Sequence, residues 1–156
     1  MANLLIVANI PSDNTRALRE AVRAGAARDD IVGVETRVLA PAAADADDVL
    51  RADGVILGTT ENFGYMSGLI KDFLERIYYP CLERTEGLPA AVYVKGGLDG
   101  AGAKASVERI LTGLKWKLVQ PTLVLTGDYG DHGAEFRVQC EELGALMAAG
   151  LEAGIF

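Results

Sequence analysis

The chain has 156 residues, the length of one ordinary domain, so we expect a single folded domain over residues 1–156. Half of the residues (50%) are hydrophobic and 24% are charged, as in globular proteins rather than disordered or fibrous ones. Asp and Glu number 22 against 15 Lys and Arg, and the resulting net charge of −7 argues against a dedicated nucleic-acid binder. The two cysteines, Cys81 and Cys140, form no CxxC pair, so neither a zinc site nor a disulfide framework is indicated.

Signals for targeting and membrane insertion are missing from this sequence. No basic leader or small-residue cleavage site precedes the first apolar run, and the longest apolar stretch, Leu143–Leu151, is too short to span a bilayer. We therefore expect a cytoplasmic protein with reduced cysteines and no membrane contact. Asp45, Asp47 and Asp48 have no spacing that indicates a metal site, and we interpret them as a solvated crossover.

Apolar runs of strand length alternate along the chain with helix-length segments of period 3.6. The Ala- and Asp-rich crossover Ala42–Asp53 is left without a predicted element. The predicted elements, in chain order, are strand Leu4–Ala8, helix Thr15–Arg28, strand Val32–Leu39, strand Gly54–Gly58, helix Ser67–Tyr79, strand Ala90–Lys95, helix Ala103–Leu114, strand Val119–Thr126 and helix Ala134–Ala153.

This alternation predicts a parallel sheet with helices on both faces. The first, third and fourth strands are continuously apolar, as expected of strands buried on both faces. The second strand places Glu35 and Arg37 on one face, and the fifth contains Pro121, so both suit the sheet edges. The fold predicted is an α/β doubly wound three-layer sandwich with a five-stranded sheet of order 2-1-3-4-5, the flavodoxin-like fold. Ligands of such sheets bind at the carboxyl ends of the strands, so the loops after the first, third and fourth strands are the candidate site.

Several nucleotide-dependent and hydrolytic chemistries lack their motifs. The turn after the first strand contains neither GxGxxG nor GxxxxGK[ST], which argues against dinucleotide binding and against ATP or GTP binding of the P-loop type. The third strand ends in Gly58-Thr59, where a response-regulator receiver would need an Asp. His132 is the only histidine and no GxSxG is present, so a Ser-His-Asp hydrolase is poorly supported.

The first candidate loop is a short polar turn that enters a helix. Ser12, Asn14 and Thr15 would add side-chain donors to the free N–H groups of the helix start, a combination that holds phosphate. The same residue types are preferred helix caps, so a simple helix start remains an alternative.

The other two loops suit a flat ligand. Gly58–Ser67 places Phe63 and Tyr65 in a glycine-containing turn at the mouth of the sheet, where a planar ring could lie against them. Gly96–Gly102 contains four glycines in seven residues, which lets the backbone approach a ligand closely. Together with a phosphate end, these loops suit a mononucleotide with a flat ring system.

Gly58–Arg76 resembles a segment of the flavodoxin-like FMN proteins, in which a G-T-P-x-x-F-G-x-M turn leads into a helix bearing K-x-F and an acidic residue. The pattern is that of the WrbA-type quinone oxidoreductases and their NAD(P)H-dependent relatives. The family's first turn, S/T-x-T/S-G-N-T, is matched in part. Ser12, Asn14 and Thr15 agree with it, whereas Ile10 replaces the first hydroxyl and Asp13 the glycine.

The resemblance implies FMN as the cofactor, with Gly64 where a backbone group meets the flavin N5. The implied cofactor-binding residues are Ser12, Asn14 and Thr15 at the phosphate, Thr59, Thr60, Glu61, Asn62, Phe63 and Gly64 around the isoalloxazine ring, and Gly96 and Gly97 at the opposite rim.

The resemblance also implies a function, an FMN oxidoreductase that passes electrons from NAD(P)H to a quinone or similar small acceptor. No residue is singled out as catalytic. A flavodoxin-type electron carrier is an alternative, in which the acidic surface would dock on basic partners. A flavin-free binding protein of the same fold is another. Tyr78-Tyr79-Pro80 suits either a subunit contact of a homo-oligomer or a local helix end, and both stay open.

Overall fold

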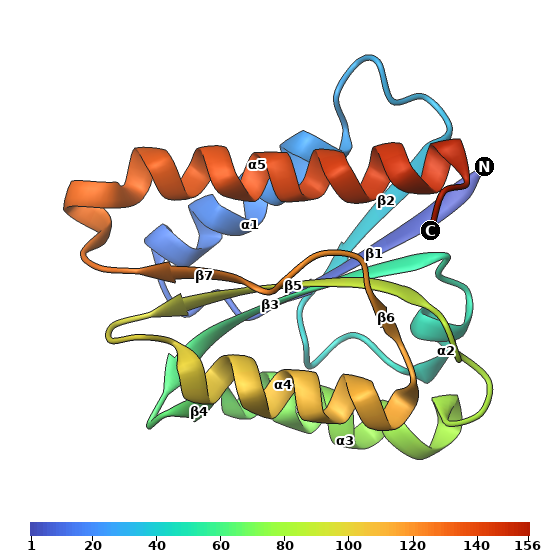
Figure 1. Ribbon diagram of the computed structural model, residues 1–156, viewed down its shortest axis with the longest axis horizontal. Helices are drawn as coiled ribbons and strands as arrows, with labels where there is room; N and C mark the ends of the chain where they lie inside the picture. The colour runs from blue at the N-terminus through green and yellow to red at the C-terminus, as the bar shows by residue number, and fades with distance from the viewer.

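The computed structural model describes residues 1–156 as a central sheet covered by helices on both faces (Figure 1). The strands are β1 Ala2–Ala8, β2 Val34–Leu39, β3 Gly54–Asn62, β4 Tyr65–Met66, β5 Pro89–Gly96, β6 Lys117–Leu118 and β7 Leu123–Thr126. The helices are α1 Asp13–Ala26, α2 Ala46–Leu50, α3 Gly68–Cys81, α4 Ala101–Leu114 and α5 Tyr129–Ala153.

The sheet has the predicted order. Its strands run β2-β1-β3-β5-β6, and β7 also pairs with β5, so β6 and β7 together take the place of the fifth strand. All these pairs are parallel, and only β4 pairs antiparallel, with β3. Val7 of β1 lies opposite Leu57 of β3, which lies opposite Val92 of β5, so the continuously apolar strands form the centre of the sheet as expected.

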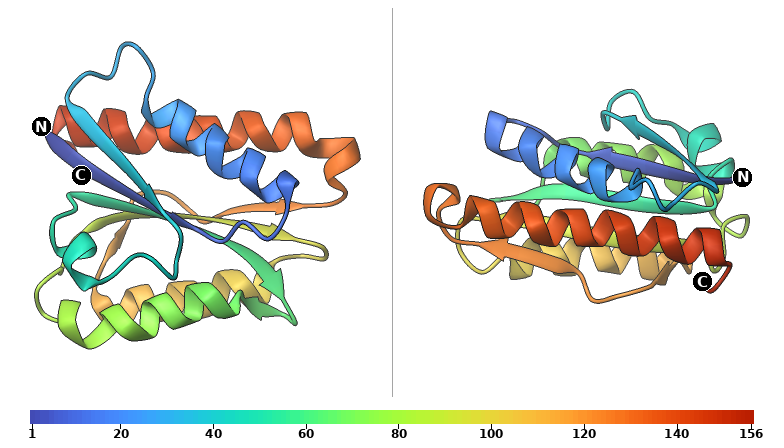
Figure 2. Two further views of the ribbon diagram at one scale, coloured as in Figure 1. Left: turned by 180° about the vertical axis from the view of Figure 1, so that it is seen from behind. Right: turned by 90° about the horizontal axis from the view of Figure 1, so that it is seen from above.

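Two helical layers bury the two faces of this sheet (Figure 2). One face packs against α1 and α5, where Leu4, Ile6 and Ile56 meet Leu18 and Leu143. The opposite face packs against α2, α3 and α4 in a second apolar cluster. Because successive side chains of a strand point to opposite faces, a continuously apolar strand supplies both cores at once.

The fifth predicted strand is the least regular. The predicted span Val119–Thr126 is strand only from Leu123 onward, and β6 precedes it as a separate short segment. Pro121 lies in the interruption, where its missing N–H removes a ladder hydrogen bond.

Other boundaries also differ from the prediction. The third strand extends to Asn62 and forms a hairpin with β4, so part of the predicted polar turn is strand. Helix α5 begins at Tyr129 rather than Ala134, although Gly130 and Gly133 weaken helix propensity there. Helix α2 occupies the crossover, which had no predicted element, because Asp45 caps it with its side chain.

Candidate functional site

The carboxyl ends of β1, β3, β5 and β7 meet at one edge of the sheet, on the left in Figure 1. An open depression of about 510 Å³ lies at this edge, a size within the usual range of ligand sites. Its lining comes from the loops after β1, β5 and β7, namely Ser12, Asn14, Thr15, Lys95, Gly97, Gly127, Asp128 and Tyr129. The depression therefore collects four of the predicted site residues: Ser12, Asn14, Thr15 and Gly97.

The loop after β1 forms a capping box at the start of α1. The Ser12 hydroxyl accepts a hydrogen bond from the Thr15 N–H at 3.2 Å, and the Thr15 hydroxyl accepts one from the Ser12 N–H at 3.0 Å. The cap interpretation is thus confirmed for these two side chains. Arg16 donates its N–H to the Ser12 carbonyl, so the N–H groups of Asp13 and Asn14 are left at the helix start as donors. A helix cap and an anion site are compatible here.

Asp13, the departure from the family's first turn, is an exposed residue of α1 and does not line the depression. Its carboxylate also lies in the first turn of a helix, where negative charge is favourable. The side chain that replaces the family's glycine thus leaves the depression open.

The loop after β3 is a hairpin whose tip presents an aromatic ring to solvent. Phe63 is fully exposed and has φ +54°, a left-handed conformation that is rare for a bulky side chain. Gly64 follows with φ +68°, so the turn has positive φ at both central residues, as in tight hairpins. The Gly64 carbonyl rests on Gly102 of α4, where a Cβ would collide with it. This contact fixes the backbone of the hairpin tip, while the Phe63 ring itself projects into solvent.

Two of the predicted flavin-lining side chains, those of Thr59 and Glu61, instead make hydrogen bonds that support the hairpin. The Thr59 hydroxyl is buried, accepts from the Ser67 N–H at 3.0 Å and donates to the Thr60 carbonyl. The Glu61 carboxylate accepts from the N–H groups of Gly100 and Ala103, at 3.3 and 3.4 Å, at the start of α4. These groups fix the hairpin to its neighbours, and their side-chain acceptors are already occupied.

A polar chain links the first two loops. The Thr60 hydroxyl lies 3.2 Å from the Asn9 amide nitrogen and 2.7 Å from the Asn62 side-chain oxygen. In the third loop, Gly96 is buried against the backbone of Gly100, whereas Gly97 is exposed with open space around it. The structure therefore places all the predicted residues at one edge, in two groups: the depression, and the hairpin with its supports.

Sequence reasoning missed Lys95, Gly127 and Asp128, which complete the depression together with Tyr129. Lys95 is the only charged residue in the apolar strand β5, a signal that could have identified it. Its ammonium donates to the carbonyls of Gly96 and Gly127, at 3.0 and 2.9 Å, and lies 5.6 Å from the ring centre of Phe136. Lys95 thus joins the loops after β5 and β7.

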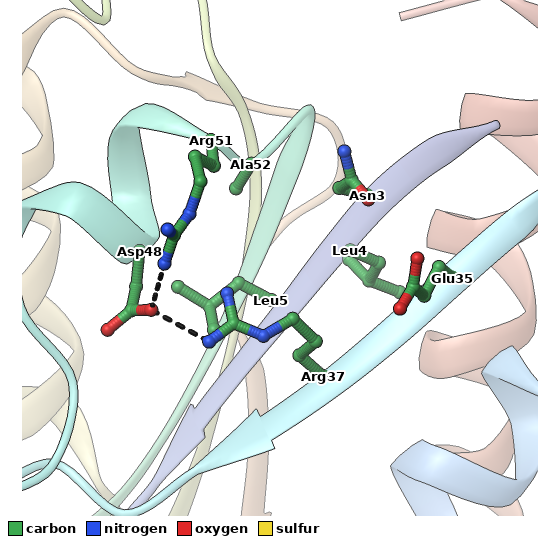
Figure 3. Close-up of a pocket in the computed structure, with 8 residues that line it drawn as sticks. All are labelled: Asn3, Leu4, Leu5, Glu35, Arg37, Asp48, Arg51 and Ala52. Atoms are coloured by element: carbon green, nitrogen blue, oxygen red, sulfur yellow. Dashed lines mark hydrogen bonds and ion pairs between the residues drawn. The ribbon is translucent and has the colours of Figure 1, made fainter.

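A second, smaller cavity of about 150 Å³ lies beside β1, β2 and α2 (Figure 3). Asp48 accepts hydrogen bonds there from Arg37 at 2.8 Å and Arg51 at 3.0 Å. Burial alone would raise the pKa of the Asp48 carboxyl, but the hydrogen bonds from Arg37 and from the Asp45 N–H, with the positive charge of Arg37, lower it overall. The expectation of a solvated acidic crossover is therefore wrong for Asp48, which is only 7% exposed.

His, Cys, Asp and Glu side chains form no group of three or more that could hold a metal ion. None of the helices has the length and apolar character needed to cross a membrane.

No family model matches the chain. A flavodoxin of Aquifex aeolicus is 29% identical over 112 residues, which are 72% of this chain and 60% of that protein, so the match spans less than two thirds of the relative. Among solved structures, a flavodoxin from the domain Archaea has a TM-score of 0.80 at 18% identity, with 96% of this chain and 99% of that chain covered.

A flavodoxin described as WrbA-like, from Agrobacterium tumefaciens, has a TM-score of 0.78 at 16% identity and covers 99% of both chains. At this level of identity the likeness concerns the fold. The strand order, the two helical layers and these similarities together show that the chain has the flavodoxin-like fold.

Proposed function

We propose that this chain binds FMN at the carboxyl edge of its sheet and works as an electron carrier of the flavodoxin type. The observation that carries the proposal is the depression of about 510 Å³, which opens between the start of α1 and the loops after β5 and β7. When bound, FMN supplies the redox chemistry, since its ring system accepts a hydride or single electrons. The role of the protein is to bind and orient the flavin.

The residues of this edge fit the two ends of FMN. Asn14 is exposed on the depression, and the backbone donors of Asp13 and Asn14 lie at the positive end of the α1 dipole, which suits a phosphate. At the hairpin tip, the exposed Phe63 ring has no apolar cover and is held in a conformation that costs about 1–2 kcal/mol. Backbone strain of this kind clusters at functional sites, so the strained Phe63 supports the proposal that the flat ring system of FMN binds against the hairpin tip.

An NAD(P)H-dependent reductase that passes electrons to a quinone is the second candidate. The likeness to the WrbA-like flavodoxin, which covers 99% of both chains, supports it. The carrier is preferred because the matched relative in sequence and the archaeal neighbour in structure are both named flavodoxins. The net charge of −7 would help a carrier dock on basic redox partners.

A titration of FMN into the purified chain tests the cofactor proposal. We expect the fluorescence of FMN to be quenched with 1:1 stoichiometry, and Asn14→Ala to weaken the affinity several-fold. Gln139→Ala, on α5 and outside the depression, is the matched control and should leave it unchanged. A colourless protein that does not quench FMN would refute the flavin site and favour a flavin-free binding protein.

A second assay separates carrier from reductase. The FMN-loaded chain is mixed with NADH or NADPH and a quinone, and the absorbance of the nicotinamide is followed. A carrier shows no steady oxidation of either nucleotide, but after chemical reduction it passes electrons to cytochrome c. Steady nucleotide oxidation that depends on the quinone would instead establish the reductase.

A further inference from the structure

Lys95 is the one cation among the eight residues that line the depression. None of the nine ion pairs of the structure includes it, so no carboxylate neutralises its charge at close range. Asp128 also lines the depression, but one of its carboxylate oxygens lies against Gly130 in the first turn of α5. The charge of Lys95 is therefore available to a ligand.

The ammonium of Lys95 is also partly uncommitted as a hydrogen-bond donor. It carries three N–H groups, of which two are used by the carbonyls of Gly96 and Gly127. These bonds, with the ring of Phe136 at 5.6 Å, fix the position of the nitrogen at the edge of the depression. The third N–H has no hydrogen-bond partner in the structure, and Lys95 lines the depression together with Ser12, Asn14 and Thr15.

On the basis of the proposed flavin site, we propose that Lys95 is the specificity-determining residue that selects a phosphorylated flavin over an unphosphorylated one. A dianionic phosphate at the start of α1 faces the fixed, unpaired charge of Lys95 across the depression. A charge-assisted hydrogen bond from a preorganised ammonium is about twice as strong as a neutral one. Lys95 also supplies the one positive charge in the lining of the depression, which offsets the negative charge of Asp128 in a chain whose net charge is −7.

A purely structural Lys95, which only ties the loops after β5 and β7 together, makes a different prediction. Its removal would loosen the rim and weaken every ligand equally. A Lys95 that acts on the phosphate changes the affinity for FMN far more than the affinity for riboflavin, which has the same ring system and no phosphate. The ratio of the two dissociation constants therefore separates the two roles.

The experiment measures the dissociation constants of FMN and riboflavin by fluorescence quenching for the wild type, Lys95→Met and Lys117→Met. Lys117 is the matched control because it is an exposed lysine of β6, at the amino end of its strand pairing with β5. We expect Lys95→Met to reduce the preference for FMN over riboflavin about tenfold or more, the effect of one charged hydrogen bond. Lys117→Met should leave the preference unchanged.

Equal weakening of both flavins in Lys95→Met, or an unchanged ratio, would overturn the role of Lys95 while the flavin site stands. Failure of the wild type to bind either flavin would overturn the proposed function and this inference with it. If Lys95→Met does not fold, Lys95→Gln and a salt series on the wild type replace it. FMN affinity should then fall with added salt while riboflavin affinity stays constant, and parallel behaviour of the two flavins contradicts the proposal.

Discussion

Substitution of Asp48 tests whether its ion pairs stabilise the crossover between β2 and β3 (Figure 3). Its side chain is only 8% exposed and accepts hydrogen bonds from Arg37, Arg51 and the Asp45 N–H. Asp48→Asn keeps the size of the side chain and removes its charge. The carboxamide oxygen can take the place of Oδ1, which accepts from both arginines, but the NH2 group then replaces Oδ2, which accepts from the Asp45 N–H, so the substitution removes the charge and one hydrogen bond.

The expected loss follows from the exposure of the partners. The Arg37 and Arg51 side chains are 40% and 65% exposed, so solvent screens both ion pairs, and each is worth about 0.2–1 kcal/mol. We therefore expect Asp48→Asn to lower the free energy of unfolding by about 1–2 kcal/mol. For a domain of this size that corresponds to a decrease in Tm of about 2–8 °C. Asp48→Ala removes the acceptor of both arginines as well, whereas the Asp45 side chain can still accept from the backbone N–H of residue 48.

The effect should depend on pH. The pKa of Asp48 is lowered in the folded protein from its ordinary value of 3.8, so the carboxylate stabilises the fold fully above that pH. The stabilisation is lost as the pH falls through the folded-state pKa. Urea unfolding at pH 7 and at pH 3 should thus show a smaller difference between wild type and Asp48→Asn in acid. Asp47→Asn, an exposed neighbour in α2, is the matched control. A loss at pH 7 equal to that of Asp47→Asn would refute the reasoning.

Three further substitutions or treatments have defined outcomes. Gly58→Ala should lower the free energy of unfolding by about 1–3 kcal/mol in denaturant titrations, because a Cβ there collides with the buried Tyr93 ring. Phe63→Asn should raise Tm slightly, since Asn tolerates positive φ, and should weaken FMN binding in the same quenching assay. Burial raises the pKa of the Cys140 thiol to about 12, and burial also raises the pKa of the Cys81 thiol above its ordinary value. A thiol reagent at pH 8 should therefore label the folded chain slowly and both cysteines rapidly in denaturant.

The sheet order could be predicted because its cause is local. Continuous apolar strands must be buried on both faces, and Glu35, Arg37 and Pro121 mark edge strands, so side chains separate inner strands from edge strands. The order 2-1-3-4-5 then follows because it is a common doubly wound order with this division. Helix α2 could not be found in this way. It has five residues and lacks an amphipathic period of its own, and its stability depends on contacts between Asp48 and Arg37, eleven positions apart in sequence.

The candidate site was predicted by residue type and by position, but the use of each side chain was not. Ser12 and Thr59 are both hydroxyl residues in segments predicted as loops after a strand, yet Ser12 lines the depression and Thr59 is buried in β3, where it accepts from the Ser67 N–H. Periodicity does not distinguish these roles, because they depend on where the next helix begins. Lys95 was missed because a single lysine at a strand end has no motif, and its meaning comes from loops far apart in the chain.

The division between committed and free polar groups explains how this edge can be stable and still bind a ligand. Glu61 caps α4 and Thr59 joins β3 to α3, so the hairpin is over-determined and can hold Phe63 in a left-handed conformation without support from a ligand. Asn14 and the third donor of Lys95 are left free at the same edge. Substitution of the committed groups should therefore lower stability first and affinity only as a consequence. Substitution of Asn14 should lower affinity alone, because the fold uses no hydrogen bond of its side chain. Substitution of Lys95 also removes its hydrogen bonds to the Gly96 and Gly127 carbonyls, so its effect on affinity must be separated from the effect on the rim by the ratio of the two flavin dissociation constants.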